Sequence, residues 1–330
     1  MEFDHLRVLE NKPIITPISL LGVPIDIGKD NEGTDTGANY LRKNGLLGML
    51  EFLKISFQDL GNIPCPKRAE CELSDKRAKF MGAIIQVAER TAQAVHDEIK
   101  KNRVVVALGG DHSMSFGTIA GAAAACEGDL GVIWIDAHGD MMTYENTRSG
   151  NIHGMPSAAA IGFGHPELVN IFKPGVKIKK ENMIYVGLKD LDQGEVDLIR
   201  QERLTAVTTF DILTNGLAPA INAIEGLNKR VKYLWVSLDL DVIDFEYAPG
   251  TPMATPGGLT HREIVNLCKY IGTSCPVVGM DIAEFSPRHD RDDKTSKLAI
   301  ELVANLLGND YGWYMRYIES EEERKSALKN

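Results

Sequence analysis

The chain lacks a long hydrophobic run: no apolar segment approaches the ~20 residues that a membrane-spanning helix needs. Residues 1–5 also lack the basic and then apolar pattern of a secretory signal peptide. We therefore expect a cytoplasmic protein that makes no contact with a membrane.

Cysteine and positive charge are both scarce. The five cysteines are an odd number at irregular spacing, which suits reduced thiols better than a disulfide framework. The net charge is −10, from 36 Lys and Arg against 46 Asp and Glu, and no basic stripe is present that could follow a phosphate backbone. These two features argue against a disulfide-stabilised secreted protein and against nucleic acid as a partner.

Linkers, repeats and low-complexity tracts are absent as well. With 44% hydrophobic and 25% charged residues, the composition is that of a globular protein with a sizeable core. We expect residues 1–330 to form a single domain, with 1–13 as an N-terminal extension and 319–330 as a charged C-terminal tail.

Short apolar runs rich in β-branched residues alternate with helical patterns along the chain. The predicted strands are 14–22, 103–108, 131–135, 183–187, 233–238 and 276–283, and the predicted helices include 79–100, 115–125, 195–201 and 261–271. Alternation of this kind predicts an α/β fold with a mostly parallel sheet that helices cover on both faces. The glycine-rich loop at 28–37 matches no nucleotide-binding fingerprint, and we expect it at the rim of an active site.

Polar side chains of one chemical kind follow three of the predicted strands. They are His112 after the second strand, Asp136, His138 and Asp140 after the third, and Asp239 and Asp241 after the fifth. Two imidazoles and four carboxylates exceed what one divalent cation uses, whereas two cations about 3.5–4 Å apart match the number and charge of these ligands. One such residue alone could simply cap a helix, but six clustered at buried strand ends would be costly without a cation. We therefore predict a two-metal hydrolytic site.

Four motifs carry a family resemblance. Gly-Gly-Asp-His-Ser at 109–113, Asp-Ala-His-Gly-Asp at 136–140, Ser-Gly-Asn-Ile-His-Gly-Met-Pro at 149–156 and Ser-Leu-Asp-Leu-Asp at 237–241 resemble the signature blocks of the arginase (ureohydrolase) family, most closely those of bacterial arginases. The similarity runs from Gly22 to about Leu307. It implies a three-layer α/β/α fold with about eight strands and a metal-dependent amidinohydrolase that cleaves C–N bonds of linear amidines.

The resemblance also implies cofactors and roles. It places one divalent metal ion on His112, Asp136, Asp140 and Asp239, and a second on Asp136, His138, Asp239 and Asp241. The family most often uses Mn²⁺, although the ligands also suit iron, cobalt, nickel or zinc. A homo-oligomer, trimer or hexamer, is expected by the same analogy.

Three residues match positions with catalytic roles in the family. Asp140 corresponds to the residue that protonates the leaving amine, and His153 to the histidine that exchanges protons with solvent. Glu284 corresponds to the carboxylate that binds the guanidinium group. By contrast, His165 and His289 lie outside the motifs, as does His261, and we interpret all three as surface or structural residues.

Other positions bear on the substrate. Thr147, Ser149 and Asp192 match the family's contacts to the carboxylate and amino group of arginine. Met142 stands where arginases carry an asparagine, and Met253 where a threonine is expected. A thioether donates no hydrogen bond. Hydrolysis of the small cationic guanidino compound L-arginine to L-ornithine and urea is favoured. Agmatine and formimidoylglutamate remain alternatives, as does a catalytically silent family member that only binds metal.

Overall fold

The computed structural model describes residues 16–73 and 75–309. The expected extension at 1–13 and the expected tail at 319–330 lie outside the described residues.

One sheet of eight parallel strands runs through the described part of the chain, in the order β2-β1-β3-β8-β7-β4-β5-β6. The strands are β1 (Ile18–Val23), β2 (Phe57–Asn62), β3 (Val104–Gly109), β4 (Leu130–Ile135), β5 (Met183–Leu188), β6 (Thr205–Thr208), β7 (Tyr233–Asp239) and β8 (Val277–Ala283). The predicted parallel sheet of about eight strands is confirmed.

The first strand begins at Ile18, and the predicted residues Thr16 and Pro17 precede it. Residues 14 and 15 of the prediction lie outside the described residues. Proline has no N–H to give to a neighbouring strand, so only the carbonyl of Pro17 takes part, accepting a hydrogen bond of 3.1 Å from the Val104 N–H.

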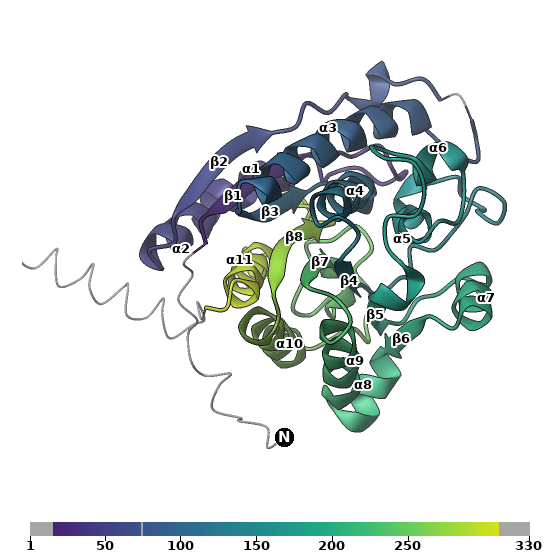
Figure 1. The fold of residues 1–330 in the computed structure, drawn as a ribbon. Helices are drawn as coiled ribbons and strands as arrows, with labels where there is room; N and C mark the ends of the chain where they lie inside the picture. Colours follow the sequence, from purple (N-terminus) through teal and green to yellow (C-terminus); the bar gives the residue numbers. More distant parts are fainter. Residues whose placement is uncertain (1–15, 74, 310–330) are drawn as a thin grey trace, which may run out of the picture.

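Helices cover both faces of this sheet (Figure 1). Those on one face are α3 (Met81–Lys100), α4 (Ser115–Ala125), α5 (Pro156–Ala160), α6 (Pro166–Val169) and α7 (Gln193–Glu202). Those on the other are α1 (Gly37–Leu41), α2 (Leu47–Phe52), α8 (Thr209–Asn215), α9 (Ala218–Asn228), α10 (His261–Ser274) and α11 (Lys294–Leu306). A kinked segment, Arg42–Leu46, joins α1 to α2, with non-helical backbone angles at Asn44 and Gly45.

Alternation along each strand builds the two cores. In β3, Val105 and Ala107 pack with the α3 and α4 side, whereas Val106 and Leu108 pack with the α10 and α11 side. Because successive side chains of a strand point to opposite faces, a run that is apolar throughout is what a central strand covered on both sides requires. The fold is thus a three-layer α/β/α sandwich.

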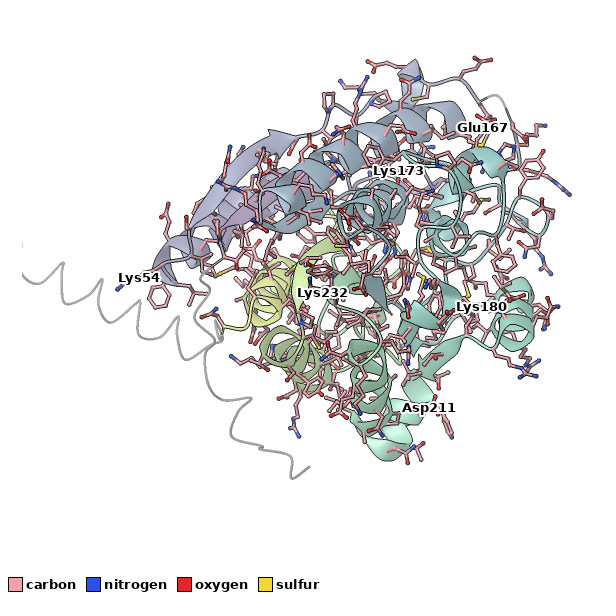
Figure 2. The ribbon with its side chains drawn as sticks, viewed as in Figure 1. Lys54, Glu167, Lys173, Lys180, Asp211 and Lys232 are labelled. Carbon is pink, nitrogen blue, oxygen red and sulfur yellow. The ribbon has the colours of Figure 1, made fainter. Side chains whose placement is uncertain are left out.

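Charged side chains lie mainly on the outside of these layers. Figure 2 shows exposed examples at the periphery, among them Lys54, Glu167 and Lys180. None of the helices that the structure describes is both long and apolar enough to pass through a bilayer.

The strand order brings distant parts of the sequence together. Strands β3, β8, β7 and β4 are consecutive neighbours in the middle of the sheet. Since all run parallel, their carboxyl ends meet at one edge, where ligand sites of α/β proteins form. The residues that follow these four strands therefore share one site, although they span positions 110 to 284 of the chain.

Candidate metal centre and active site

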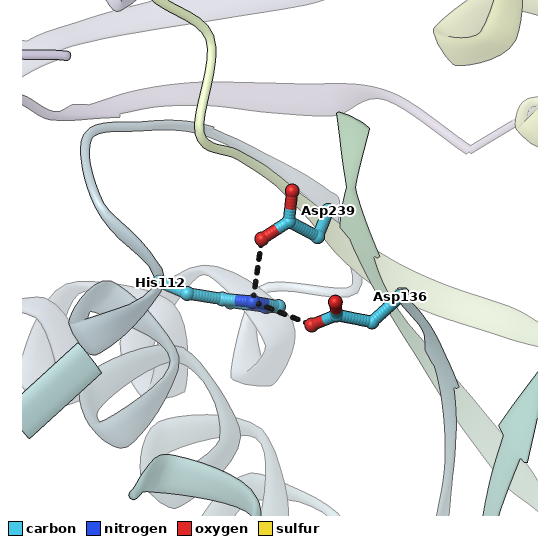
Figure 3. A group of neighbouring side chains, drawn as sticks. All are labelled: His112, Asp136 and Asp239. Carbon is cyan, nitrogen blue, oxygen red and sulfur yellow. Dashed lines mark ion pairs between the residues drawn. The ribbon is translucent and has the colours of Figure 1, made fainter. Parts of the chain in front are cut away.

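The six side chains predicted as metal ligands come together at this edge. His112 lies in a short 3₁₀ turn directly after β3, and Asp136 follows the last residue of β4. Asp239 is the last residue of β7. Figure 3 shows the carboxylates of Asp136 and Asp239 pointing toward the ring of His112 from their two strands.

Three carboxylates converge on one nitrogen of His112. Its Nδ1 atom lies 3.1 Å from Asp136 Oδ2, 3.0 Å from Asp140 Oδ2 and 3.1 Å from Asp239 Oδ2. A ring nitrogen can give at most one hydrogen to these three oxygens. Neither His112 Nδ1 nor Asp140 Oδ2 has a well-oriented hydrogen-bond partner, although both atoms are buried. A cation among the four groups satisfies all of them at once, so the donor set fits a metal ion.

A second group of ligands lies beside the first. Nδ1 of His138 is 3.1 Å from Asp241 Oδ2 and 3.5 Å from Asp136 Oδ1. Asp136 belongs to both groups, with one oxygen facing each histidine. A shared carboxylate between two ligand sets is the arrangement that holds two cations close together.

Local hydrogen bonds fix the carboxylates in place. Asp136 accepts from the indole N–H of Trp134 at 3.0 Å and from the backbone N–H of His138 at 2.7 Å. Asp239 Oδ1 accepts from the backbone N–H of Asp241 at 2.8 Å. These contacts orient the acceptor oxygens before any cation binds.

The far side of the His112 ring is also held. Its Nε2 atom lies 3.0 Å from Ser237 Oγ, and the ring stacks on Trp134 with centroids 4.3 Å apart. Ser237 donates its hydroxyl hydrogen to the buried carboxylate of Asp281 at 2.6 Å. Because that hydrogen is committed, Ser237 accepts from Nε2–H, which leaves the Nδ1 lone pair of a neutral ring for a cation.

Electrostatics at the centre reflect its density of negative charge. Burial alone would lower the pKa of His112, but the carboxylates of Asp136, Asp140 and Asp239, which can accept from a protonated ring, raise it well above its usual value. Burial and the neighbouring charge of Asp136 raise the pKa of Asp140 well above the ordinary range of a carboxyl group. A site that attracts protons this strongly also attracts metal cations.

Two site residues adopt a strained backbone. Asp140 has φ +48° and Glu284 has φ +64°, in the left-handed region of backbone conformation that residues other than glycine rarely adopt. Glu284 is held there because its N–H donates to the Gly110 carbonyl at 2.9 Å. Strain retained at such positions is typical of functional sites.

A cavity of about 400 Å³ opens beside the two ligand groups. Its lining includes the predicted site residues His138, Asp140, Thr147, Ser149, His153, Asp192, Asp239, Asp241 and Glu284. Met142 and Met253 line it too, so both departures from the family pattern face the space that a substrate would occupy. The loop at 28–37 contributes Lys29, Asp30 and Asn31, as expected for a loop at the rim.

The substrate-binding candidates keep donors for a ligand. The Thr147 hydroxyl accepts from the Gly150 N–H at 3.0 Å, and the Ser149 hydroxyl accepts from the Asn151 N–H at 3.2 Å. Each hydroxyl retains its own hydrogen to donate. Asp192 is exposed and immediately precedes α7.

His153 is fixed by the loop across the cavity. Its backbone N–H donates to the Gly28 carbonyl at 3.0 Å, and its Nδ1 lies 3.2 Å from the same oxygen. Burial and the nearby Lys29 ammonium lower the pKa of His153 to about 3. The ring is therefore neutral at pH 7, with Nδ1 donating to the Gly28 carbonyl and Nε2 left as an acceptor.

Sequence reasoning missed two features of the site. Lys29 reaches the cavity from the loop after β1 and forms a buried ion pair with Glu284, and it is the one cation among residues 28–37. Asp281 and Ser237 lie within β8 and β7, and the signal available for them was a polar residue inside each apolar run.

The histidines interpreted as structural have local roles away from the cavity. His165 accepts from the Glu167 N–H at the start of α6, and His289 Nδ1 lies 2.8 Å from Ser286 Oγ. The half-exposed side chain of His261 lies beside Glu301. Met114 and Met155 are buried among apolar side chains and contribute to packing.

Comparisons with known proteins agree with this picture. The sequence model described as "Arginase family" matches residues 16–308. The arginase of Bacillus caldovelox is 38% identical over 294 residues, covering 88% of this chain and 98% of that protein, and the arginase of Bacillus subtilis is 36% identical over 291 residues, covering 88% and 97%. The solved structure of the Bacillus caldovelox arginase superposes with a TM-score of 0.86 at 37% identity, covering 90% of this chain and all of that one.

Proposed function

The chain belongs to the arginase family and is a metal-dependent amidinohydrolase; we propose that its substrate is a guanidino compound, with L-arginine, giving L-ornithine and urea, as the first candidate. One observation carries the proposal: the Glu284 carboxylate and members of both ligand groups line the same cavity. A guanidinium group at Glu284 would lie next to the place where a hydrolytic water is activated.

We propose that His112, Asp136, Asp140 and Asp239 hold one divalent cation, and that Asp136, His138, Asp239 and Asp241 hold the other. When bound, such a pair supplies Lewis acidity and a water activated near neutral pH. Manganese is the proposed metal because all the ligands are oxygen or imidazole nitrogen. A cytoplasmic homo-oligomer, trimer or hexamer, is proposed from the family alone.

The protein's own residues would bind the substrate and move its protons. Glu284 would accept hydrogen bonds from the nitrogens of the amidino group and so orient the carbon of that group. Asp140, whose Oδ2 has no well-oriented partner, would carry a proton to the leaving amine. His153 would exchange protons with solvent, the role that its place in the family motif implies.

Agmatine is a second candidate because of Met142. This side chain lines the cavity where the family has an amide donor for the substrate carboxylate. Agmatine keeps the guanidinium and an amine for Asp192 but has no carboxylate. Its binding therefore does not depend on a hydrogen-bond donor at position 142.

A metal titration with a substrate panel tests the proposal. The protein would be stripped of metal, reloaded with increasing Mn²⁺ and assayed for urea from L-arginine, agmatine and simple guanidines. We expect urea release to rise until two equivalents are bound. Ammonia from an amidine such as formimidoylglutamate, without urea from any guanidine, would overturn the guanidine assignment. No turnover with any metal would favour a silent metal-binding protein.

A further inference from the structure

Lys29 fills the position at Glu284 that a substrate cation would need. The side chains of Lys29 and Glu284 are each only 3% exposed, and Nζ is in direct contact with Oε2. Both residues line the cavity beside the metal ligands. The carboxylate that would attract a guanidinium group is therefore already paired with a cation from the protein.

The backbone around Lys29 is firmly held. The Gly28 N–H donates to the buried Asp111 carboxylate at 2.8 Å, and the Gly28 carbonyl accepts from the His153 N–H at 3.0 Å. Arg68 donates to the carbonyl of Lys29 itself. The framework thus places the Lys29 side chain in the cavity.

Both oxygens of Glu284 are in use. Oε1 accepts from the backbone N–H of His112 at 3.0 Å, and Oε2 is in contact with Lys29. A guanidinium group meets a carboxylate most strongly as a fork, with two parallel hydrogen bonds to the two oxygens. It can form that contact only by displacing the Lys29 ammonium or by lying against it.

The cost of lying against the Lys29 ammonium depends on the charge of the ligand. A guanidinium cation next to a buried ammonium suffers like-charge repulsion that little water can screen. An uncharged ureido group avoids that repulsion, and its oxygen offers a lone pair to which the ammonium can donate. The ion pair therefore penalises the charged group selectively.

We infer that Lys29 is a specificity-determining residue that competes with a guanidinium cation for Glu284, so that charged guanidines bind this site more weakly, relative to uncharged isosteres, than they would without Lys29. The inference rests on the proposed function, because it assumes that the reacting group of the substrate lies at Glu284. L-Arginine would be accepted weakly, since its guanidinium must displace Lys29.

Two ligands of nearly the same shape, one charged and one uncharged, test this inference. n-Butylguanidine is a cation and n-butylurea is its uncharged isostere, and both lack groups for Thr147, Ser149 or Asp192. Their affinities for the manganese-loaded protein would be measured by calorimetry, with urea release followed in parallel to correct for turnover. Replacing Lys29 by methionine keeps the length of the side chain and removes its charge. We expect Lys29→Met to raise the ratio of guanidine to urea affinity by about tenfold or more.

Four further variants make the result specific. Lys29→Arg keeps a cation and should keep the wild-type ratio. Lys79→Met removes another lysine charge near the loop, where Lys79 pairs with Asp30 at 2.8 Å, and should also keep it. The double variant Lys29→Met with Glu284→Gln should not show the increase in the ratio of guanidine to urea affinity. Lys29→Gln provides the same comparison if Lys29→Met fails to fold.

An unchanged ratio in Lys29→Met or Lys29→Gln would overturn the inference, and so would a gain that persists without Glu284. Failure of the proposed function looks different. It appears as absence of turnover across the substrate panel, whereas the affinity ratio is measured whether or not any substrate is hydrolysed.

Discussion

The hydroxyl of Ser237 lies 3.0 Å from Nε2 of His112, on the side of the ring opposite the carboxylate cluster. Ser237 in turn donates a hydrogen bond to the buried carboxylate of Asp281. Thr118 and Trp235 also donate to this carboxylate, each at 2.6 Å. This chain of hydrogen bonds orients the ring so that Nδ1 faces the metal site.

Replacing Ser237 by alanine should weaken metal binding. Without the acceptor at Nε2, the ring loses both its orientation and its preference for the tautomer that leaves Nδ1 free. Loss of such an outer partner typically lowers metal affinity about 10- to 100-fold. A Mn²⁺ titration at fixed pH measures the change. Ser115→Ala is the matched control, because it removes another donor to Asp281 but leaves the contact with His112 intact. Equal effects in the two variants would contradict a specific role for Ser237.

Replacing Met142 by asparagine should favour L-arginine over agmatine. The new amide restores a donor at a position that lines the cavity. A hydrogen bond to a charged group contributes about 1.5–3 kcal/mol, which corresponds to roughly a ten- to hundredfold change in affinity. The kcat/KM for L-arginine should rise by about that factor, while the value for agmatine, which has no carboxylate, should stay constant. A parallel rise for both substrates would show that Met142 does not face the carboxylate.

Much of the fold and of the metal site could be predicted because the signals are local. Central strands such as β4 and β5 are apolar throughout, and the ligands follow directly where β3, β4 and β7 end. A parallel sheet brings those ends together whatever the loops do.

Strands β2 and β6 escaped prediction for a physical reason. They form the two edges of the sheet, where one side has no neighbouring strand. The sequence of β2 is partly polar and half-exposed, and β6 has only four residues. Neither needs the continuous apolar run by which buried strands are found.

The pairing of Lys29 with Glu284 was out of reach of sequence reasoning. The two residues are 255 positions apart, and the loop that carries Lys29 has no periodic pattern. Its path is set by tertiary contacts, such as the hydrogen bond from Gly28 to Asp111. Contacts of that kind appear only once the sheet is assembled.

Removing bound metal should destabilise the protein. Asp136, Asp140, Asp239 and Asp241 are all buried, and without a cation their charges lie close together with little solvent. A ligand at 100 times its dissociation constant stabilises the folded state by about 2.7 kcal/mol. Thermal unfolding with Mn²⁺ and with a chelator measures this difference. Asp136→Asn, which alters the carboxylate shared by both ligand groups, should respond much less to Mn²⁺. The same metal response in that variant as in the wild type would contradict the shared site.

Replacing Glu98 by glutamine should destabilise the fold in a pH-dependent way. This buried carboxylate near the end of α3 accepts from Ser19 Oγ and from Lys101 Nζ, each at 2.6 Å. Burial alone would raise the pKa of Glu98, but the hydrogen bonds from Lys101 and Ser19 and the charges of Lys101 and Arg103 lower it below its ordinary value of 4.5. At pH 7 the loss should be about 1.5–3 kcal/mol, the range for hydrogen bonds to a charged group.

The sign of the pH effect follows from the lowered pKa of Glu98. A carboxyl group whose pKa is lower in the folded state contributes its full stability above the unfolded value, near 4.5, and loses it as the pH falls through the folded value. The difference between wild type and Glu98→Gln should therefore be constant from about pH 6 to 8 and shrink below 4.5. Urea denaturation of the metal-free protein measures it without interference from metal release. Glu127→Gln is the control, because Glu127 pairs with Lys100 but its side chain is 81% exposed, so no measurable change is expected. A difference for Glu98→Gln that stays constant down to pH 3 would show that the charge of this carboxylate does not stabilise the fold.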